Sequence, residues 1–356
     1  NKHRFEGMWP LPYGVSYNSY LIDDEMVALV DTVDICYFEV YLRKIKQVIG
    51  ERPINYLIIN HMEPDHSGSI RLIKQHYPEI IIVGNKQTFG MIEGFYGVTG
   101  EQYLVKEGDF LALGHHKLRF YMTPMVHWPE TMMTFDETDG VLFSGDGFGC
   151  FGTVDGGFLD TRINVDKYWG EMVRYYSNIV GKYGSPVQKA LQKLGGLPIS
   201  AICSTHGPVW TENIAKVIGI YDRLSRYDAD EGVVIAYGSM YGNTEQMAEA
   251  IAEELSAQGV KNIVMHNVTK SHPSYIIADI FRYKGLIIGS PTYSNQIFPE
   301  VEALLSKILL REVKGRYLGY FGSFTWAGAA VKRMAGFAEK SKFELVGNPV
   351  EMKQAM

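Results

Sequence analysis

The sequence predicts an α/β protein of two domains, residues 1–228 and 229–356, the second of which is a doubly wound parallel sheet. The chain has 356 residues, more than one ordinary hydrophobic core organises. Over the first two-thirds, predicted strands end in loops rich in His, Asp and Gly. From Gly232 onward, strand, glycine-containing turn and helix alternate, which is typical of parallel strands covered by helices.

The composition excludes several classes of protein. Hydrophobic residues make up 46% and charged residues 21%, and the net charge of −6 comes without a dense basic tract. We therefore expect no nucleic-acid partner and no anionic membrane partner. No apolar run approaches the roughly 20 residues that a spanning helix needs. The three cysteines form no CxxC pair, so we expect a reducing, cytoplasmic setting.

The first domain mixes strands and helices in one core. A short acidic turn, Asp24-Glu25, joins its first two strands, and a helix with apolar residues at helical spacing follows at 38–49. A charged stretch before Gly232 indicates the linker, with the boundary near Asp228. The strands are expected at 16–23, 26–31, 56–59, 80–83, 118–122, 140–144 and 199–203.

The second domain repeats one pattern to its end. Strands are expected at 232–237, 263–266, 285–288, 317–321 and 343–346, and helices at 244–256, 299–310 and 328–341. The chain opens without a Met and stops just after its last predicted strand. We therefore expect a missing N-terminal segment and a missing last helix.

A metal site is indicated by one loop of the first domain. Asn60-His61-Met62-Glu63-Pro64-Asp65-His66 leaves an apolar strand and offers four groups that bind cations, which a loop can fold around a metal. One such residue after a strand is usually a turn or surface group, but three later loops repeat the feature, which makes a shared site the better interpretation. The later candidates are His127, Asp146 and His206.

These motifs resemble the metallo-β-lactamase superfamily, whose hydrolytic members carry His-x-His-x-Asp-His. Glu63 stands here at the position of the second motif histidine. This substitution resembles the flavodiiron branch of the superfamily, and a carboxylate makes the site harder and more anionic, which favours iron over zinc. The resemblance implies an αββα sandwich for the first domain.

The resemblance also implies a ligand set for two irons. It places His61, Glu63 and His127 on one iron, and Asp65, His66 and His206 on the other, with Asp146 bridging. In some members the histidine that matches His66 swings away from the metal. Tyr175 is a candidate catalytic residue that offers a hydroxyl near the substrate, against the alternative of a structural tyrosine on a packed helix.

A phosphate site is indicated at the first turn of the second domain. The loop after strand 232–237 has hydroxyls and a glycine directly before a helix N-terminus, a combination that holds phosphate. It has neither the GxGxxG pattern of a dinucleotide site nor the Lys of a nucleoside-triphosphate loop, so a mononucleotide fits best. The candidate residues are Ser239, Met240, Tyr241, Gly242, Asn243 and Thr244.

Two later loops complete this candidate site, since ligands of open α/β sheets bind at the carboxyl ends of the strands. Each loop carries an aromatic residue among small polar ones: Pro291, Thr292, Tyr293 and Asn295 in one, and Ser323, Phe324, Thr325, Trp326 and Gly328 in the other. An isolated aromatic is more often a packing residue, but three such loops favour a ligand. The arrangement resembles flavodoxin, with strand order 2-1-3-4-5 and bound FMN.

Together the two resemblances cover nearly the whole chain and imply a flavodiiron oxidoreductase. Such a protein reduces O2 to water and/or NO to N2O, with electrons delivered through FMN from rubredoxin or another small redox carrier. The resemblance also implies a head-to-tail homodimer, or a dimer of dimers, that brings each flavin to the partner's diiron site. The alternatives are a metal-dependent hydrolase fused to an electron-transfer domain, and a non-catalytic flavodoxin-like interaction protein with a vestigial first domain.

Overall fold

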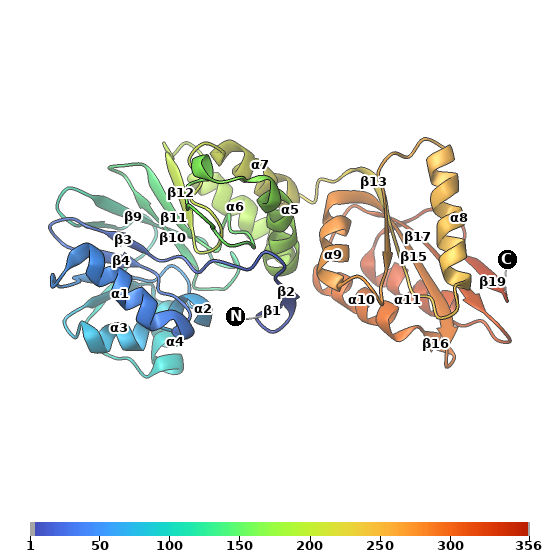
Figure 1. Ribbon diagram of the computed structural model, residues 1–356, viewed down its shortest axis with the longest axis horizontal. Helices are drawn as coiled ribbons and strands as arrows, with labels where there is room; N and C mark the ends of the chain where they lie inside the picture. The colour runs from blue at the N-terminus through green and yellow to red at the C-terminus, as the bar shows by residue number, and fades with distance from the viewer. Residues whose placement is uncertain (1–3, 355–356) are drawn as a thin grey trace. The chain divides into compact units, whose positions relative to one another are not determined.

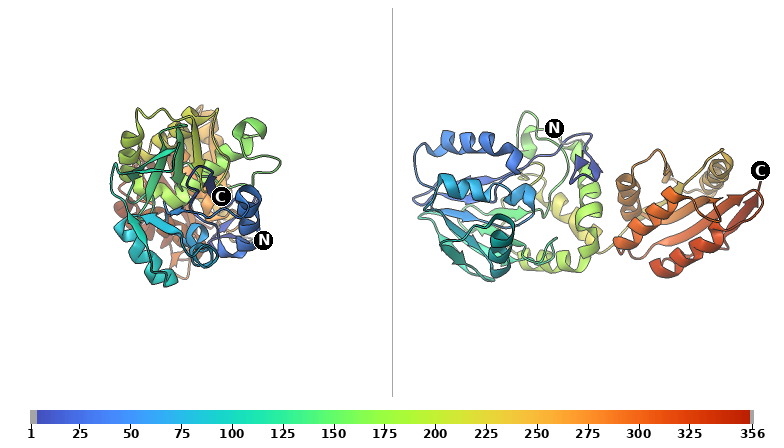
Figure 2. Two further views of the ribbon diagram at one scale, coloured as in Figure 1. Left: turned by 90° about the vertical axis from the view of Figure 1, so that its left-hand side faces the viewer. Right: turned by 90° about the horizontal axis from the view of Figure 1, so that it is seen from below.

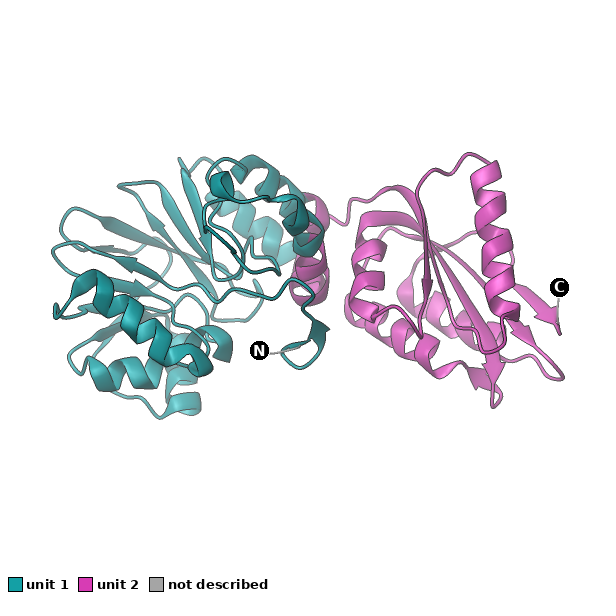
Figure 3. Ribbon diagram, in the orientation of Figure 1, with its two compact units in different colours: residues 1–172, 185–222 teal, residues 173–184, 223–356 magenta. Residues whose placement is uncertain are grey.

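The computed structural model describes residues 4–354, which form two compact units (Figure 3). Unit 1 comprises the chain up to Met172 together with Ser185–Asp222, and unit 2 comprises Val173–Gly184 together with the chain from Arg223. The domain boundary near Asp228 remains a prediction. Among the described residues, no helix is both long and apolar enough to cross a membrane.

The first sheet of unit 1 starts with the expected hairpin. β3 (Tyr20–Ile22) pairs antiparallel with β4 (Ala28–Val30), and the remaining strands continue in parallel in the order β3-β4-β5-β6-β7. These remaining strands are β5 (Tyr56–Ile58), β6 (Ile81–Gly84) and β7 (Gln102–Leu104).

The second sheet of unit 1 is largely antiparallel and has the order β12-β11-β10-β9-β8. Only β11 and β12 run in parallel, and their carboxyl ends both lead into the metal-site loops. Its strands are β8 (Phe110–Ala112), β9 (Lys117–Met122), β10 (Met132–Asp136), β11 (Val141–Gly145) and β12 (Ala201–Ser204).

Two hydrophobic layers hold unit 1 together. Val30 and Ile58 of the first sheet pack with Phe120 of the second in a core between the sheets. Alternate strand residues, such as Leu29 and Leu57, face the other way and pack against helices. Helices therefore flank the sheets on both outer sides (Figure 1), and the expected αββα sandwich is confirmed. These helices are α1 (Phe38–Ile49), α3 (Ile70–His76), α4 (Lys86–Tyr96), α5 (Asp166–Tyr175), α6 (Gly184–Leu194) and α7 (Ile214–Ser225).

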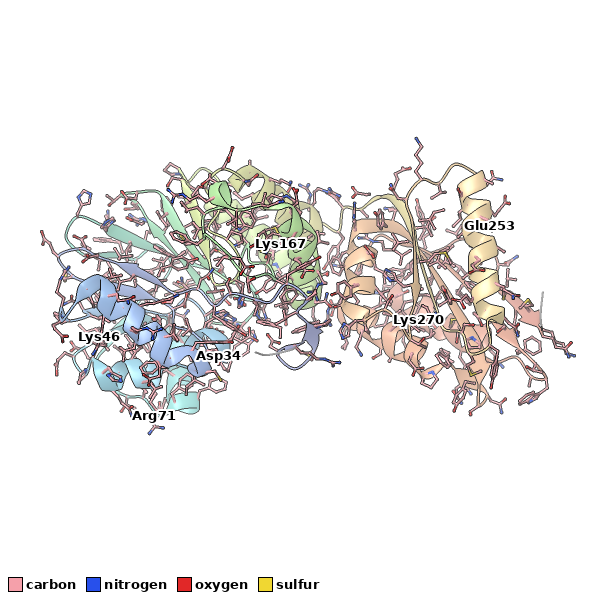
Figure 4. All side chains as sticks on the ribbon, viewed as in Figure 1. Asp34, Lys46, Arg71, Lys167, Glu253 and Lys270 are labelled. Atoms are coloured by element: carbon pink, nitrogen blue, oxygen red, sulfur yellow. The ribbon has the colours of Figure 1, made fainter. Side chains whose placement is uncertain are left out.

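Helix α1 shows how the sequence dictates these layers. Its buried residues, Phe38, Tyr41, Leu42, Ile45 and Ile49, recur at the three- and four-residue spacing of one helix face. The opposite face is exposed and includes the side chain of Lys46, labelled in Figure 4. The helix ends at Gly50, whose φ of 63° favours glycine.

The main strands of unit 2 form a parallel sheet in the order β14-β13-β15-β17-β18, which confirms the doubly wound topology, and of the strands described only the short β16 (Gln296–Ile297) pairs antiparallel, with the end of β15. Helices lie on both sides of it (Figures 1 and 2), and α8 covers a core of Ile235, Met247 and Phe321. The strands are β13 (Asp230–Tyr237), β14 (Ile263–Asn267), β15 (Tyr283–Tyr293), β17 (Tyr317–Phe324) and β18 (Glu344–Leu345). The helices are α8 (Asn243–Ala257), α9 (Pro273–Arg282), α10 (Pro299–Leu310) and α11 (Ala330–Ser341).

Several elements lie beyond the sequence-based expectations. Strand β10, helix α9 and the edge strand β19 (Val350–Lys353) were not expected, and β15 is longer than its predicted core. β19 pairs in parallel with the last residues of β17, beyond the point where β18 pairs. The predicted strand at 343–346 therefore shares its edge with a second short strand.

Candidate metal centre and flavin site

The metal-site residues are placed by the ends of four strands. The loop after β5 passes directly into the short helix α2 (Pro64–Ser67), which starts at a proline and carries Asp65 and His66. His127 lies between β9 and β10, Asp146 follows β11, and His206 follows β12. All of these residues are buried.

The seven predicted ligands form two groups, and within each group the ligand atoms lie within 4.8 Å of one another. In the first group, the Nε2 atom of His127 lies 3.0 Å from Oε2 of Glu63, and Nε2 of His61 lies 3.5 Å from the same oxygen. In the second group, the Nε2 atoms of His66 and His206 each lie 3.2 Å from Oδ2 of Asp65.

Asp146 faces both groups with different oxygens. Its Oδ2 atom lies 3.1 Å from Nε2 of His127 and 3.6 Å from Nε2 of His61. Its Oδ1 atom lies 2.9 Å from Nε2 of His66 and 3.7 Å from Nε2 of His206. A carboxylate in this position can bind two cations at once.

The chemistry of the cluster fits metal ions. Nε2 of His61 and both carboxylate oxygens of Asp65 are buried and make no hydrogen bond, an arrangement that is costly unless a cation binds them. Within the described residues, the ion-pair partners of Glu63, Asp65 and Asp146 are all histidines.

The electrostatics lead to the same conclusion. Burial and the neighbouring carboxylates of Glu63, Asp65 and Asp146 raise the pKa of Glu6 to about 10, although Glu6 as a whole residue is exposed. Burial lowers the pKa of His66, but the charges of Asp65 and Asp146 outweigh it and raise that pKa to about 9. The carboxylates of the cluster therefore favour positive charge on the groups between them, as a cation site requires.

Three outer contacts orient the cluster, and the sequence interpretation missed them. Nδ1 of His61 lies 2.8 Å from Oε1 of Glu130, Nδ1 of His206 lies 2.7 Å from the Ser16 carbonyl oxygen, and the Thr205 hydroxyl donates to Oδ1 of Asp146 at 2.6 Å. Each contact turns a metal-facing atom toward the cluster. Glu130 follows His127 by three residues, which is the signal that could have revealed it.

An aromatic wall encloses the second group. Phe5, which is 2% exposed, and Tyr17 both meet the ring of His206 edge-on, at centroid distances of 5.2 and 5.6 Å. Phe5 lies in the N-terminal hairpin of β1 (Arg4–Phe5) and β2 (Trp9–Pro10). This short hairpin therefore helps to cover the buried ring of His206.

Tyr175 lies at the end of α5 and is fully buried. The two groups consist of histidines and carboxylates only, so they do not test a role for the Tyr175 hydroxyl. Its catalytic role therefore remains a prediction.

The predicted flavin-binding loops line a cavity of about 460 Å³ at the carboxyl edge of the parallel sheet in unit 2, a volume in the range of small-molecule sites. All the predicted residues of the three loops line it except Gly242 and Gly328. The lining also includes Ser294, Ala327 and Gln354, which the sequence interpretation missed. Gln354 comes from the segment after β19.

The geometry of the first loop suits a phosphate. Gly242 has a φ of 93° and directly precedes α8, so the N–H groups of the first helical turn are free to bind an anion. The Thr244 and Ser323 hydroxyls lie 2.9 Å apart and join the first loop to the last. Trp326 and Tyr241, which are 87% and 88% exposed, present open ring faces beside the cavity, as stacking on a planar ligand requires.

Comparison with protein families agrees with both sites. Residues 15–207 match the model of the "ODP family beta lactamase", and residues 235–356 match that of flavodoxin. The chain is 33% identical over 336 residues to the anaerobic nitric oxide reductase flavorubredoxin of Vibrio vulnificus, covering 93% of this chain and 68% of that protein.

Solved structures show the same two-part architecture. The rubredoxin oxygen:oxidoreductase of Desulfovibrio gigas superimposes with a TM-score of 0.95 at 30% identity, covering 99% of this chain and 88% of that one. The flavodiiron protein of Giardia intestinalis gives a TM-score of 0.95 at 27% identity, with coverages of 99% and 87%. With its diiron-type cluster and its flavin cavity, this chain belongs to the flavodiiron protein family and is an oxidoreductase that uses FMN and a non-haem diiron centre.

Proposed function

We propose that this protein reduces O2 to water and/or NO to N2O. The observation that carries the proposal is Asp146, whose two oxygens face two separate groups of histidines and carboxylates. The names of the relatives from Vibrio vulnificus and Desulfovibrio gigas, a nitric oxide reductase and an oxygen oxidoreductase, support both gases as substrates. The direct test is anaerobic stopped-flow oxidation of the reduced protein by each gas in turn.

Seven residues would hold the irons. His61, Glu63 and His127 would hold one ion and Asp65, His66 and His206 the other, with Asp146 able to serve both because its two oxygens face the two groups. When bound, the iron pair supplies open coordination positions and electrons for a diatomic gas. The chain's own contribution is to hold the imidazoles by their outer nitrogens and to cover the ring of His206 with Phe5 and Tyr17.

The flavin would be held by the three loops of unit 2. Ser239, Thr244 and the N-terminus of α8 would take the phosphate, and Tyr293 and Trp326, which line the same cavity, would border the isoalloxazine. The purified protein is expected to be yellow, with about one FMN and two irons per chain. Zinc without flavin, after growth in iron-replete medium, would contradict both assignments.

A metal-dependent hydrolase is not favoured. Glu63 puts a carboxylate next to His127, where the hydrolytic pattern has a third imidazole. Iron analysis combined with the gas assay separates the two functions, because a hydrolase would retain activity with zinc and show no oxidation by either gas.

The electron donor, the assembly and the compartment complete the proposal. A small redox carrier such as rubredoxin supplies the electrons, in keeping with the names of the relatives. Two chains form a head-to-tail homodimer, alone or as a dimer of dimers, in which each flavin serves the partner's diiron site. The protein acts in the cytoplasm, where its three free cysteines remain reduced.

A further inference from the structure

Glu130 makes the two halves of the metal cluster different from each other. Its side chain is completely buried, and its Oε1 atom accepts hydrogen bonds from Nδ1 of His61 and from the Met62 N–H group, both at 2.8 Å. The Asn85 amide holds the backbone of the same residue by donating to the Glu130 carbonyl at 2.6 Å. The carboxylate is thus fixed against His61.

The second half of the cluster has a neutral partner at the corresponding place. Nδ1 of His206 lies 2.7 Å from a backbone carbonyl oxygen, that of Ser16. A carboxylate partner makes an imidazole a more basic and more anionic ligand than a carbonyl partner does. His61 and His206 therefore differ as ligands, although both present Nε2 to the cluster.

The inner ligands cannot be the source of this difference. Each half has two imidazoles, one terminal carboxylate and one oxygen of Asp146, so the charges of the inner ligands are equal. The half that contains His61 has an additional negative charge at hydrogen-bond distance, that of Glu130 at 2.8 Å from Nδ1 of His61.

We propose that Glu130 is a positioning residue that fixes the His61 ring with Nε2 toward the metal and renders the two metal positions inequivalent. The proposal rests on the ligand assignment of the proposed function. Glu130 tightens metal binding at the position formed by His61, Glu63 and His127, and it favours the higher iron oxidation state there. The position formed by Asp65, His66 and His206 would therefore be the easier of the two to reduce.

The first test uses metal binding alone. Metal-free full-length protein is titrated with Co²⁺ while the visible absorption is followed, for wild type and for Glu130→Gln, which removes the charge but keeps the shape. One of two sites should weaken by about 10–100-fold, the usual effect of losing an outer partner, and the other should be unchanged. Glu130→Asp, which keeps the charge, should restore part of the loss.

Asp160→Asn is the matched control, because it makes the same carboxylate-to-amide change at a buried position of unit 1 whose hydrogen-bond partners lie outside the cluster. It should leave both Co²⁺ sites unchanged. If Glu130→Gln weakens both sites equally, or neither, Glu130 does not distinguish the two positions and the proposal is overturned.

The second test is spectroscopic and uses the iron-loaded protein. Stepwise reduction monitored by EPR should give a half-reduced species in wild type, and its yield should fall in Glu130→Gln because the two positions become more alike. An unchanged yield would overturn the assignment of oxidation states. A wild-type protein that binds fewer than two metals would instead refute the proposed function, so the two failures can be told apart.

Discussion

At the scale of single residues, we expect the activity to depend on a few carboxylates that differ in how many metal groups they contact. Asp146 faces two groups, Glu63 belongs to one, and Glu130 lies outside both and contacts His61. Substitutions of these three carboxylates should therefore differ in kind: one should release both metals, one should change the metal preference, and one should weaken a single metal position.

Replacing Asp146 by alanine should cost more than losing a terminal ligand. Because one carboxylate faces both groups, Asp146→Ala should release both irons, whereas His127→Ala or His206→Ala should spare one. We expect turnover to fall by more than the roughly 10–100-fold that loss of an outer partner costs. Iron per chain and gas turnover are measured together, with the exposed Asp155→Ala as control. A tightly bound iron pair in Asp146→Ala would disprove the bridge.

Replacing Glu63 by histidine should change the metal. The substitution exchanges a hard anionic oxygen for a neutral nitrogen, so zinc should compete better with iron and turnover with either gas should fall. Metal analysis after growth with both ions gives the iron-to-zinc ratio. Glu63→Gln keeps an oxygen and serves as comparison. An unaltered ratio and turnover in Glu63→His would mean that Glu63 is not a ligand.

At the scale of elements, buried polar side chains fix the conformation of loops through hydrogen bonds, as Asp160 does. It is 4% exposed, and its carboxylate accepts from the N–H groups of Thr211 and Asn213 and from the Thr211 hydroxyl, at 2.7 to 3.0 Å. These contacts fix the turn that leads into α7. The stability of this turn should therefore depend on an ionised carboxylate.

Asp160→Ala should lower the free energy of unfolding by about 2–3 kcal/mol at pH 7, because it leaves buried donors without an acceptor.

Burial raises the pKa of Asp160, but its hydrogen bonds outweigh burial and the pKa is lowered. A lowered pKa means stability that is present above the ordinary value of 3.8 and is lost as the pH falls through the folded-state value. Urea unfolding of wild type and Asp160→Asn between pH 7 and about pH 3 measures this. An acid dependence of equal size in the amide variant would contradict it.

The same scale shows how far sequence reasoning reaches. Helices α1 and α10 begin and end where apolar spacing, Gly50 and Pro299 indicate. Strand β10 escaped prediction because all its residues are buried, which removes the alternation that marks a half-exposed strand. The inner ligands were recognisable because each lies in the segment that follows a strand. The contact of Glu130 with His61 joins residues 69 positions apart, and the only local sign of it is the place of Glu130 three residues after His127.

At the scale of the whole molecule, electrons must pass from a flavin in unit 2 to irons in unit 1. The sites are built from separate parts of the chain, with the metal groups in unit 1 and the flavin cavity in unit 2. A two-fold interface would provide two equivalent flavin–iron pairs from a single set of contacts. Subunit complementation can therefore test the assembly.

A mixed dimer should recover activity that its parents lack. One chain carries His127→Ala with Asp146→Ala, and the other carries Ser239→Ala with Thr244→Ala. If each flavin serves the partner, one intact pair remains across the interface and about half of the wild-type turnover should return. The two chains are co-expressed with different tags and the mixed species is isolated. A mixed dimer that stays inactive, with both cofactors at half occupancy, would show that transfer runs within a chain.

The chain passes between the two units three times, after Met172, Gly184 and Asp222, and this limits how the protein can be divided. Val173–Gly184 packs on α9 in unit 2, where Asn178 donates to the Ser274 carbonyl at 3.0 Å and Gly181 leaves room for the ring of Phe281. A fragment that starts at Arg223 would expose this apolar surface and lose its hydrogen-bond donor. A chimera that exchanges only the chain from Arg223 onward between two relatives would therefore separate Val173–Gly184 from α9, on which it packs. A working chimera has to exchange residues 173–184 as well.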